Sequence, residues 1–366
     1  MNRRARLRIA CALPMAVGLA TLTTGAAPQE RAPVPSPAFV PAVSYPYQAV
    51  KRHEYGVGAK SYWIFEPAEP TPKTAPVVVF HHGWLAVNPG AYGAWIEHLV
   101  RSGRIVILPR YQDDWTTRPA EFLPNALEAV RDAFDVLQTA RDHVRPDRER
   151  FALIGHSAGG NLSAQMAAVA RETGLPPPKA LVLLMPGEVK SLREPNLSRI
   201  PSTTLLVVVA AEHDRVVGDL RARQIYLGAT SVPSARKKYV FYRTDRHGFP
   251  HLIADHLAPT AALELFDTGE GPFHSLQMTE AEINAFDYRG FWRLADITID
   301  AGFAGRTLDE ATHYGDLFRD LGHWSDGTAV ISPLVTDDIS TIPRVFPSNG
   351  LKLIPWQVSG FPLIED

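Results

Sequence analysis

Short apolar segments alternate with amphipathic ones through the middle of the chain, and this alternation restricts the fold more than any other feature. Strands without a polar face, joined by helices, are typical of a mostly parallel sheet with helices on both faces. The sequence therefore predicts an α/β fold of this type, with 62–65 as an antiparallel strand at one edge. The predicted buried strands are 76–80, 104–108, 151–154, 180–184, 204–210 and 238–242, and helical spacing occurs near 91–102, 120–143, 158–172, 216–228 and 279–302.

The two ends of the chain differ from this pattern. Residues 1–27 have a basic start, an apolar run of about 14 residues and then small residues, the layout of a secretory signal peptide and too short for a membrane span. Six prolines in 28–46 indicate an extended tether. We expect a folded domain over 47–304, with 260–279 as a candidate lid, and a C-terminal extension over 305–366. The protein is therefore expected to be exported, without stable membrane insertion after cleavage.

Charge and cysteine content exclude several classes of function. The 366 residues include 37 basic and 39 acidic side chains, and four of the arginines precede residue 9, so the remainder is net negative and suits no nucleic acid. The single cysteine, Cys11, lies in the predicted signal peptide, so the rest holds no disulfide, thiolate nucleophile or cysteine-bound metal. No ligand spacing of the His-Glu-x-x-His kind occurs, and we expect neither a catalytic metal nor a cofactor.

A candidate nucleophile lies between one predicted strand and the helix that follows it. The strand 151–154 runs into Gly155-His156-Ser157-Ala158-Gly159, which is the pattern Gly-x-Ser-x-Gly. Glycines flank the serine because a strand that turns at once into a helix leaves no room for larger side chains. The turn would expose the Ser157 hydroxyl at the carboxyl edge of the sheet. The backbone N–H of Ala158, which opens the helix, would then face the oxygen of a carbonyl under attack.

This segment resembles the nucleophile turn of the α/β-hydrolases, and the resemblance covers roughly 47–260 plus the helix near 280–302. The segment His81-His82-Gly83-Trp84 resembles the family's loop after the third strand, which implies that the N–H of Trp84 is the second oxyanion donor. We expect His81 and His82 to shape this loop rather than to act as bases.

A serine nucleophile needs a histidine to take its proton and a carboxylate to orient that histidine. The family order is serine, acid, histidine. The turn after the strand 204–210 resembles the family's acid turn, which makes Asp214 the predicted acid. Glu212 in the same turn and Glu188 after an earlier strand remain alternatives.

The base is expected just past the last predicted strand. His247 is the predicted base because Gly248 keeps the adjacent backbone open. His251 is the alternative, although it falls in a helix expected after Pro250. His256, deeper in that helix, is interpreted as a surface or packing residue.

These parts predict an exported serine hydrolase that cleaves carboxylic esters through an acyl-enzyme. The region 76–260 is similar to the dienelactone-hydrolase-like and cutinase-like esterases, but the chain has no cysteine pair, and Gly187 stands where that branch often has tryptophan. A small-molecule ester is therefore the expected substrate. A peptidase or amidase of the same fold and a non-catalytic binding protein are the alternatives.

Overall fold

The computed structural model describes residues 44–188 and 195–348. The predicted signal peptide, almost all of the predicted tether and the last part of the predicted C-terminal extension lie outside these ranges, so their predictions stay predictions.

A nine-stranded sheet forms the centre of the described chain, in the order β1-β2-β4-β3-β5-β6-β7-β8-β9. Strands β3 to β8 are parallel to one another, whereas β1 and β2 at one edge and β9 at the other are antiparallel to their neighbours. The strands are β1 (Ala49–Tyr55), β2 (Tyr62–Ala68), β3 (Thr74–His81), β4 (Ile105–Pro109), β5 (Arg145–His156), β6 (Ala180–Leu184), β7 (Leu205–Ala211), β8 (Lys237–Tyr242) and β9 (Leu334–Thr336).

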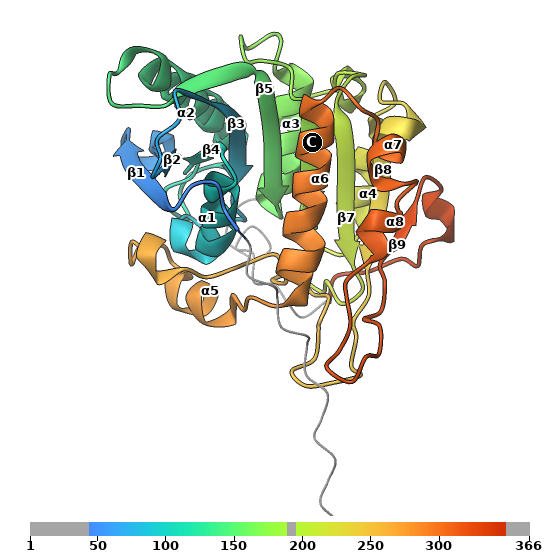
Figure 1. Cartoon of the computed structure of the whole chain (residues 1–366). Helices are drawn as coiled ribbons and strands as arrows, with labels where there is room; N and C mark the ends of the chain where they lie inside the picture. Colours follow the sequence, from blue (N-terminus) through green and yellow to red (C-terminus); the bar gives the residue numbers. More distant parts are fainter. Residues whose placement is uncertain (1–43, 189–194, 349–366) are drawn as a thin grey trace, which may run out of the picture. The chain divides into compact units, whose positions relative to one another are not determined.

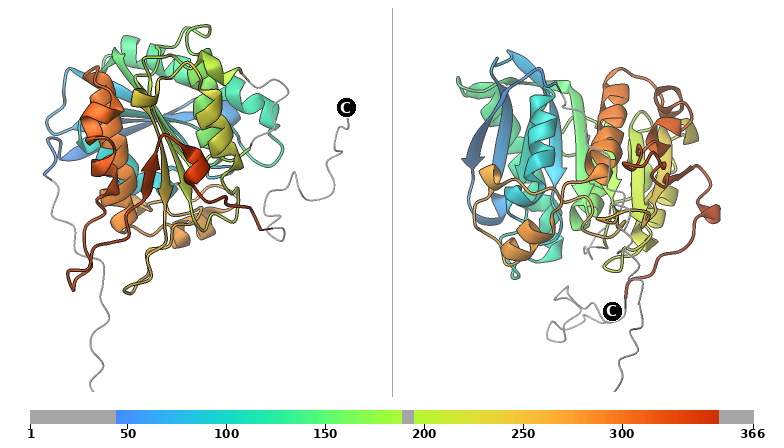
Figure 2. Two further views of the ribbon diagram at one scale, coloured as in Figure 1. Left: turned by 90° about the vertical axis from the view of Figure 1, so that its right-hand side faces the viewer. Right: turned by 60° about the horizontal axis from the view of Figure 1, so that its bottom comes forward.

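Helices cover both faces of this sheet. Apolar side chains of α1 and α6 pack on one face, and those of α2, α3 and α4 pack on the other. Figure 2 (left) shows α6 in orange on one side of the strands and α4 in yellow-green on the other. The helices are α1 (Gly93–Arg101), α2 (Pro119–Thr139), α3 (Ala158–Val169), α4 (Leu220–Gly228), α5 (His274–Glu280), α6 (Trp292–Phe303), α7 (Leu308–Thr312) and α8 (Asp316–Arg319).

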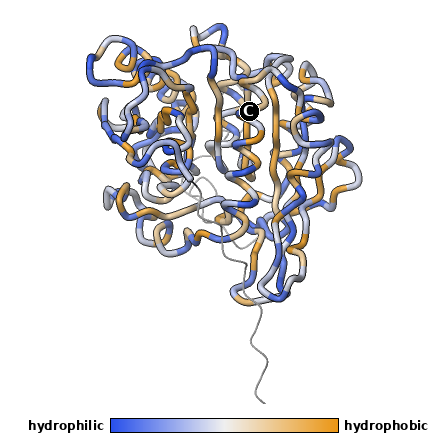
Figure 3. The backbone as a smooth tube through the Cα atoms, in the orientation of Figure 1, coloured by the Kyte–Doolittle hydropathy of each residue, from blue (hydrophilic) through white to orange (hydrophobic). Residues whose placement is uncertain are grey.

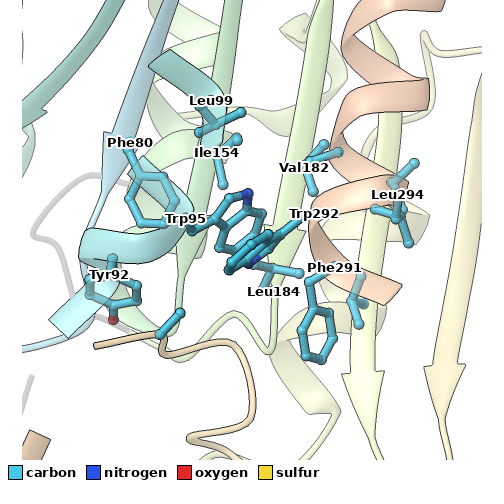
Figure 4. Close-up of a cluster of buried hydrophobic side chains, with 14 of the residues drawn as sticks. Phe80, Tyr92, Trp95, Leu99, Ile154, Val182, Leu184, Phe291, Trp292 and Leu294 are labelled. Carbon is cyan, nitrogen blue, oxygen red and sulfur yellow. The ribbon is translucent and has the colours of Figure 1, made fainter. Parts of the chain in front are cut away.

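The parallel strands are apolar on both faces because each face is covered. Within β3, Val77 and Val79 belong to the core under α2 and α3, whereas Val78 and Phe80 belong to the core under α1 and α6. Figure 3 shows such a hydrophobic stretch, in orange, along β7. Figure 4 shows Trp95 of α1 and Trp292 of α6 in the second of these cores, with Ile154 of β5 and Val182 of β6. The alternation of side chains in a strand therefore divides one apolar segment between two cores.

This architecture confirms the predicted α/β fold with its mostly parallel sheet. All six predicted parallel strands are present, and the predicted antiparallel strand is β2. However, β2 is not the edge strand, because β1 pairs along its outer side. The predicted helix near 279–302 is a π-helical turn at Phe286–Phe291 followed by α6.

Residues 305–348 lie against the last strands of the sheet. Strand β9 pairs with β8, and α7 and α8 precede it (Figure 1). The buried carboxylate of Asp245, just past β8, joins this segment to the sheet: one oxygen accepts hydrogen bonds from Trp324 Nε1 at 3.0 Å and from the Ile331 backbone N–H at 2.9 Å. The other oxygen accepts the backbone N–H of His247.

Within the described ranges, every helix is too short or too polar to span a lipid bilayer.

We predict that Asp245→Asn destabilises the protein by about 1–3 kcal/mol, because an amide nitrogen cannot accept the N–H groups that the carboxylate serves. Burial raises the pKa of Asp245, but these donors outweigh it and leave the pKa below its ordinary value. The stabilisation is therefore present above about pH 4 and lost as the pH falls through the lower folded-state pKa. Urea unfolding across this pH range is the measurement.

Asp316→Asn provides a matched control, because Asp316 is exposed and pairs only within its own helical turn, with Arg319. Its unfolding free energy should change by no more than about 0.5 kcal/mol. Equal effects of the two substitutions would contradict the role given to Asp245.

Candidate active site

The turn from β5 into α3 has the geometry that the Gly-x-Ser-x-Gly pattern predicts. Ser157 links the strand to the helix with φ 56° and ψ −123°, a backbone conformation that costs energy for a residue other than glycine. A Cβ atom at Gly155 would collide with the carbonyl oxygen of Gly159, and one at Gly159 would collide with the carbonyl oxygens of His81 and His82. The two glycines are therefore required by the close approach of α3 to β5 and β3.

Ser157 faces His256, and the interpretation of this histidine as a surface or packing residue is therefore wrong. The Nε2 atom of His256 lies 2.9 Å from Ser157 Oγ, and its Nδ1 atom lies 2.8 Å from Asp214 Oδ2. A carboxylate can only accept, so Nδ1 of a neutral ring carries the proton and Nε2 accepts the hydroxyl proton of Ser157. The three side chains thus form a continuous hydrogen-bonded row.

Asp214 is fully buried and held by its own turn. It follows β7, and its Oδ1 atom accepts the backbone N–H groups of Val216 and Val217, both at 3.0 Å. These bonds satisfy Oδ1 of the buried carboxylate and leave Oδ2 for His256. The alternative acids lie elsewhere: Glu212 accepts the backbone N–H of Thr244, and Glu188 is exposed.

The predicted position of His247 beside Ser157 is wrong. Its side chain is 38% exposed, and its Nε2 atom lies 2.8 Å from Asp326 in the C-terminal segment. The alternative, His251, is also exposed, and its Nδ1 lies 2.6 Å from the carbonyl oxygen of Gly248. Neither histidine has a hydrogen bond with Ser157 or Asp214.

His247 and His251 lie away from Ser157 because of the path that the chain takes after β8. The expected helix after Pro250 is absent; instead, Asp245 and Leu252 exchange two backbone hydrogen bonds and close a loop over 246–251. This loop carries His247 to the neighbouring C-terminal segment. The chain then returns, and His213 N–H donates to the carbonyl of Ala254, which brings His256 next to the acid turn. No local pattern around His256 signals this return.

The loop after β3 borders the nucleophile. A Cβ atom added to Gly83 would lie 3.5 Å from Ser157 Cβ, so the backbone at Gly83 is close to the nucleophile. Trp84 is the next residue in the sequence. His81 Nδ1 lies 2.8 Å from Ser163 Oγ, and the ring of His82 lies between the carbonyls of Gly83 and Arg110. Burial lowers the pKa of His81 to about 3 and that of His82 to about 4, and for His82 the hydrogen bonds to the two carbonyls oppose this effect in part.

An aromatic cluster lies beside this loop. The ring of Trp84 lies edge-on to Trp115 at a centroid distance of 5.2 Å, and Phe273 lies 5.2 Å from Trp115 and 6.2 Å from Trp84. Phe273 belongs to the candidate lid. Backbone hydrogen bonds from Ala261 and Leu263 fasten the start of this segment to the turn before α1.

One group in the described chain has side chains of the kind that bind metal ions: His53, Glu66 and His143. His143 Nδ1 already lies 2.6 Å from Glu66, and its Nε2 lies 2.8 Å from the hydroxyl of Tyr55. His143 precedes the start of β5, whereas Ser157 follows its end, so the group lies at the opposite edge of the sheet. It is separate from the row of Ser157, His256 and Asp214.

Comparisons with known proteins agree with the fold. Residues 77–239 match a family model described as alpha/beta hydrolase fold. Esterase LipI of Mycobacterium tuberculosis is 30% identical over 160 residues, which cover 42% of this chain and 47% of that protein. Cutinase cut1 of Thermobifida fusca is 27% identical over 242 residues, covering 63% of this chain and 67% of the cutinase. The chain thus spans about half the length of the mycobacterial relative.

The matched segment begins in β3 and ends in β8, so it includes the parallel strands, the turn at Ser157 and Asp214. Together with the sheet order, the match shows that this part of the chain is similar to the alpha/beta hydrolase fold, and the relatives to which the chain is similar include an esterase and a cutinase.

Proposed function

We propose that this protein is a serine hydrolase that cleaves carboxylic esters, with Ser157 as nucleophile, His256 as base and Asp214 as the orienting acid. The observation that carries the proposal is the pair of hydrogen bonds that His256 makes, at 2.9 Å to Ser157 and at 2.8 Å to Asp214. A neutral imidazole in this position takes a proton from the hydroxyl as a carbonyl carbon is attacked. The similarity to an esterase and a cutinase supports an ester as the substrate.

The reaction would proceed in two halves. Ser157 Oγ attacks the ester carbonyl while its proton moves to His256 Nε2, and the buried carboxylate of Asp214 stabilises the imidazolium. The N–H groups of Ala158 and Trp84 are proposed to hold the oxyanion. The alcohol leaves with the proton from His256. Water, deprotonated by His256, then attacks the acyl-enzyme. The carboxylic acid is released, and His256 returns the proton to Ser157 Oγ, which regenerates the hydroxyl.

A small-molecule ester remains the proposed substrate. Gly187 donates its backbone N–H to the carbonyl of Ser157, and a Cβ atom there would lie 3.5 Å from Ser157 Oγ and 2.9 Å from Val217 Cγ1. The space beside the nucleophile is therefore narrow on this side, and a tryptophan at position 187 would displace Val217.

We also propose export through residues 1–27, which N-terminal sequencing of the secreted protein would check.

We predict that Ser157→Ala lowers ester turnover by a factor on the order of 10⁶ without unfolding the protein, because the nucleophile and its base act as one unit. Turnover of a chain-length series of p-nitrophenyl esters, with peptide p-nitroanilides alongside, is the measurement, and circular dichroism checks the fold. A variant that keeps a tenth of the wild-type turnover would exclude Ser157, and faster cleavage of the anilides would favour an amidase.

The identity of the base is tested with two histidines from the irregular segment after β8. His256→Ala should reduce turnover to within about tenfold of Ser157→Ala, and the double variant should be no slower, because both residues act on one proton. His247→Ala is the matched control and should keep turnover within about threefold of the wild type, since removing an exposed ion pair costs little. A slow His247→Ala beside an active His256→Ala would refute the assignment.

For the acid, Asp214→Asn should lower turnover by about 10⁴, because an amide would favour the wrong tautomer of His256 and could not stabilise its protonated form. Glu212→Gln and Glu188→Gln serve as controls and should each lower turnover by less than about tenfold. If either glutamine variant were the severely impaired one, Asp214 would lose its role.

A further inference from the structure

His156, which precedes the nucleophile, is a buried histidine that the reaction above does not use. Its Nδ1 atom lies 2.8 Å from the hydroxyl of Tyr92, and its Nε2 atom lies 2.8 Å from the backbone carbonyl oxygen of His256. The hydroxyl of Tyr92 in turn accepts the backbone N–H of Gly83 at 2.9 Å. Three hydrogen bonds therefore connect Gly83, Tyr92, His156 and His256.

These hydrogen bonds can run in one direction only. The carbonyl of His256 cannot donate, so Nε2 of His156 carries the proton. Burial lowers the pKa of His156 well below its ordinary value, so the ring is neutral and its Nδ1 atom accepts. The hydroxyl of Tyr92 must then give its proton to Nδ1 while its oxygen accepts the N–H of Gly83. Each polar atom in this row of three hydrogen bonds therefore has a protein partner.

The two ends of this row of hydrogen bonds lie at two different parts of the site. Gly83 precedes Trp84, the proposed oxyanion donor, and the carbonyl at the other end belongs to His256, the proposed base. Tyr92 itself sits at the border of the apolar core: Figure 4 shows its ring near Phe80, with the oxygen directed away from Trp95 and Trp292. Its ring centroid lies 5.1 Å from that of Phe80, so core packing fixes the hydroxyl.

His256 depends on such contacts because no helix or strand holds it. Residues 246–260 are irregular apart from the bridge at Leu252. A displacement of about 1 Å of a catalytic group can cost about 10² in rate. We propose that Tyr92 and His156 are positioning residues that hold the backbone of His256 and the Gly83–Trp84 loop in register with Ser157. The proposal rests on the proposed ester hydrolysis. The ring of His156 lies beside that of His256, at a centroid distance of 4.9 Å, but neither Tyr92 nor His156 makes or breaks a bond in the reaction.

Tyr92→Phe is the decisive variant, because it removes one oxygen and leaves the core packing in place. We expect kcat for a p-nitrophenyl ester to fall about 10-fold to 100-fold while KM stays within about threefold, since substrate contacts are unchanged. His156→Leu should lower kcat at least as much, and the double variant should be no slower than the slower single variant, because both break one chain. His156→Gln, whose amide supplies a donor and an acceptor, should recover part of the loss.

Tyr62→Phe is the matched control. Tyr62 is equally buried, and its hydroxyl donates to Asp132 at 2.6 Å, on the face of the sheet covered by α2. This variant should keep kcat within about twofold of the wild type, as expected for a site distant from the reaction. Wild-type kcat in Tyr92→Phe, or a loss expressed in KM alone, would overturn the proposal.

A second measurement needs no activity. Nitrogen-15 NMR of histidine-labelled protein, with His156 assigned from the His156→Gln variant, should show a neutral ring protonated at Nε2 from about pH 5 to about pH 9. The same tautomer should persist in Ser157→Ala. An inactive wild type with this spectrum would refute the proposed function and leave the hydrogen-bond chain intact, whereas a ring that titrates or is protonated at Nδ1 would overturn the positioning role.

Discussion

The close approach of α3 to the end of β3 is the constraint on which the rest of the site depends. Position 159 lies so near the carbonyls of His81 and His82 that only glycine fits, and position 155 is equally crowded against the helix. The backbone therefore turns sharply at Ser157 and accepts an unfavourable φ of 56° there. The nucleophile and the loop after β3 are brought together by this packing, before any catalytic contact is considered.

The remaining groups reach Ser157 from separate loops, and buried hydrogen bonds hold them there. The carboxylate of Asp214 is held by two backbone N–H groups of its own turn and by His256. His256 is held at its side chain by Asp214 and at its carbonyl by His156. The two hydrogen bonds of His256, to Asp214 and to His156, are buried, and a misaligned polar group costs more there than at the surface. The precision of the site thus depends on loops that these hydrogen bonds hold in place.

The sequence predicted those parts of the molecule that depend on local pattern. Strands β3 to β8 contain segments that are apolar on both faces, although the first half of β5 is polar. The glycines around Ser157 follow from a steric requirement that lies within five residues. Strand β1 alternates polar and partly buried side chains, and β9 has three residues, so neither has the pattern of a buried strand. Asp214 follows its strand directly and was predicted at the place where the structure has it. His256 comes 14 residues after β8. It reaches Ser157 only because Asp245 and Leu252 pair and close a loop that places His247 away from the nucleophile. That pairing is a tertiary event that no local spacing encodes.

The most direct test of this account is the rate and position of labelling by an organophosphonate ester, which reacts with a serine only when a base activates it. We predict one adduct, located by mass spectrometry on Ser157, at wild-type rate in His247→Ala and slowed by at least about 10³ in His256→Ala. An adduct on another residue, or rapid labelling of His256→Ala together with loss of labelling in His247→Ala, would contradict it.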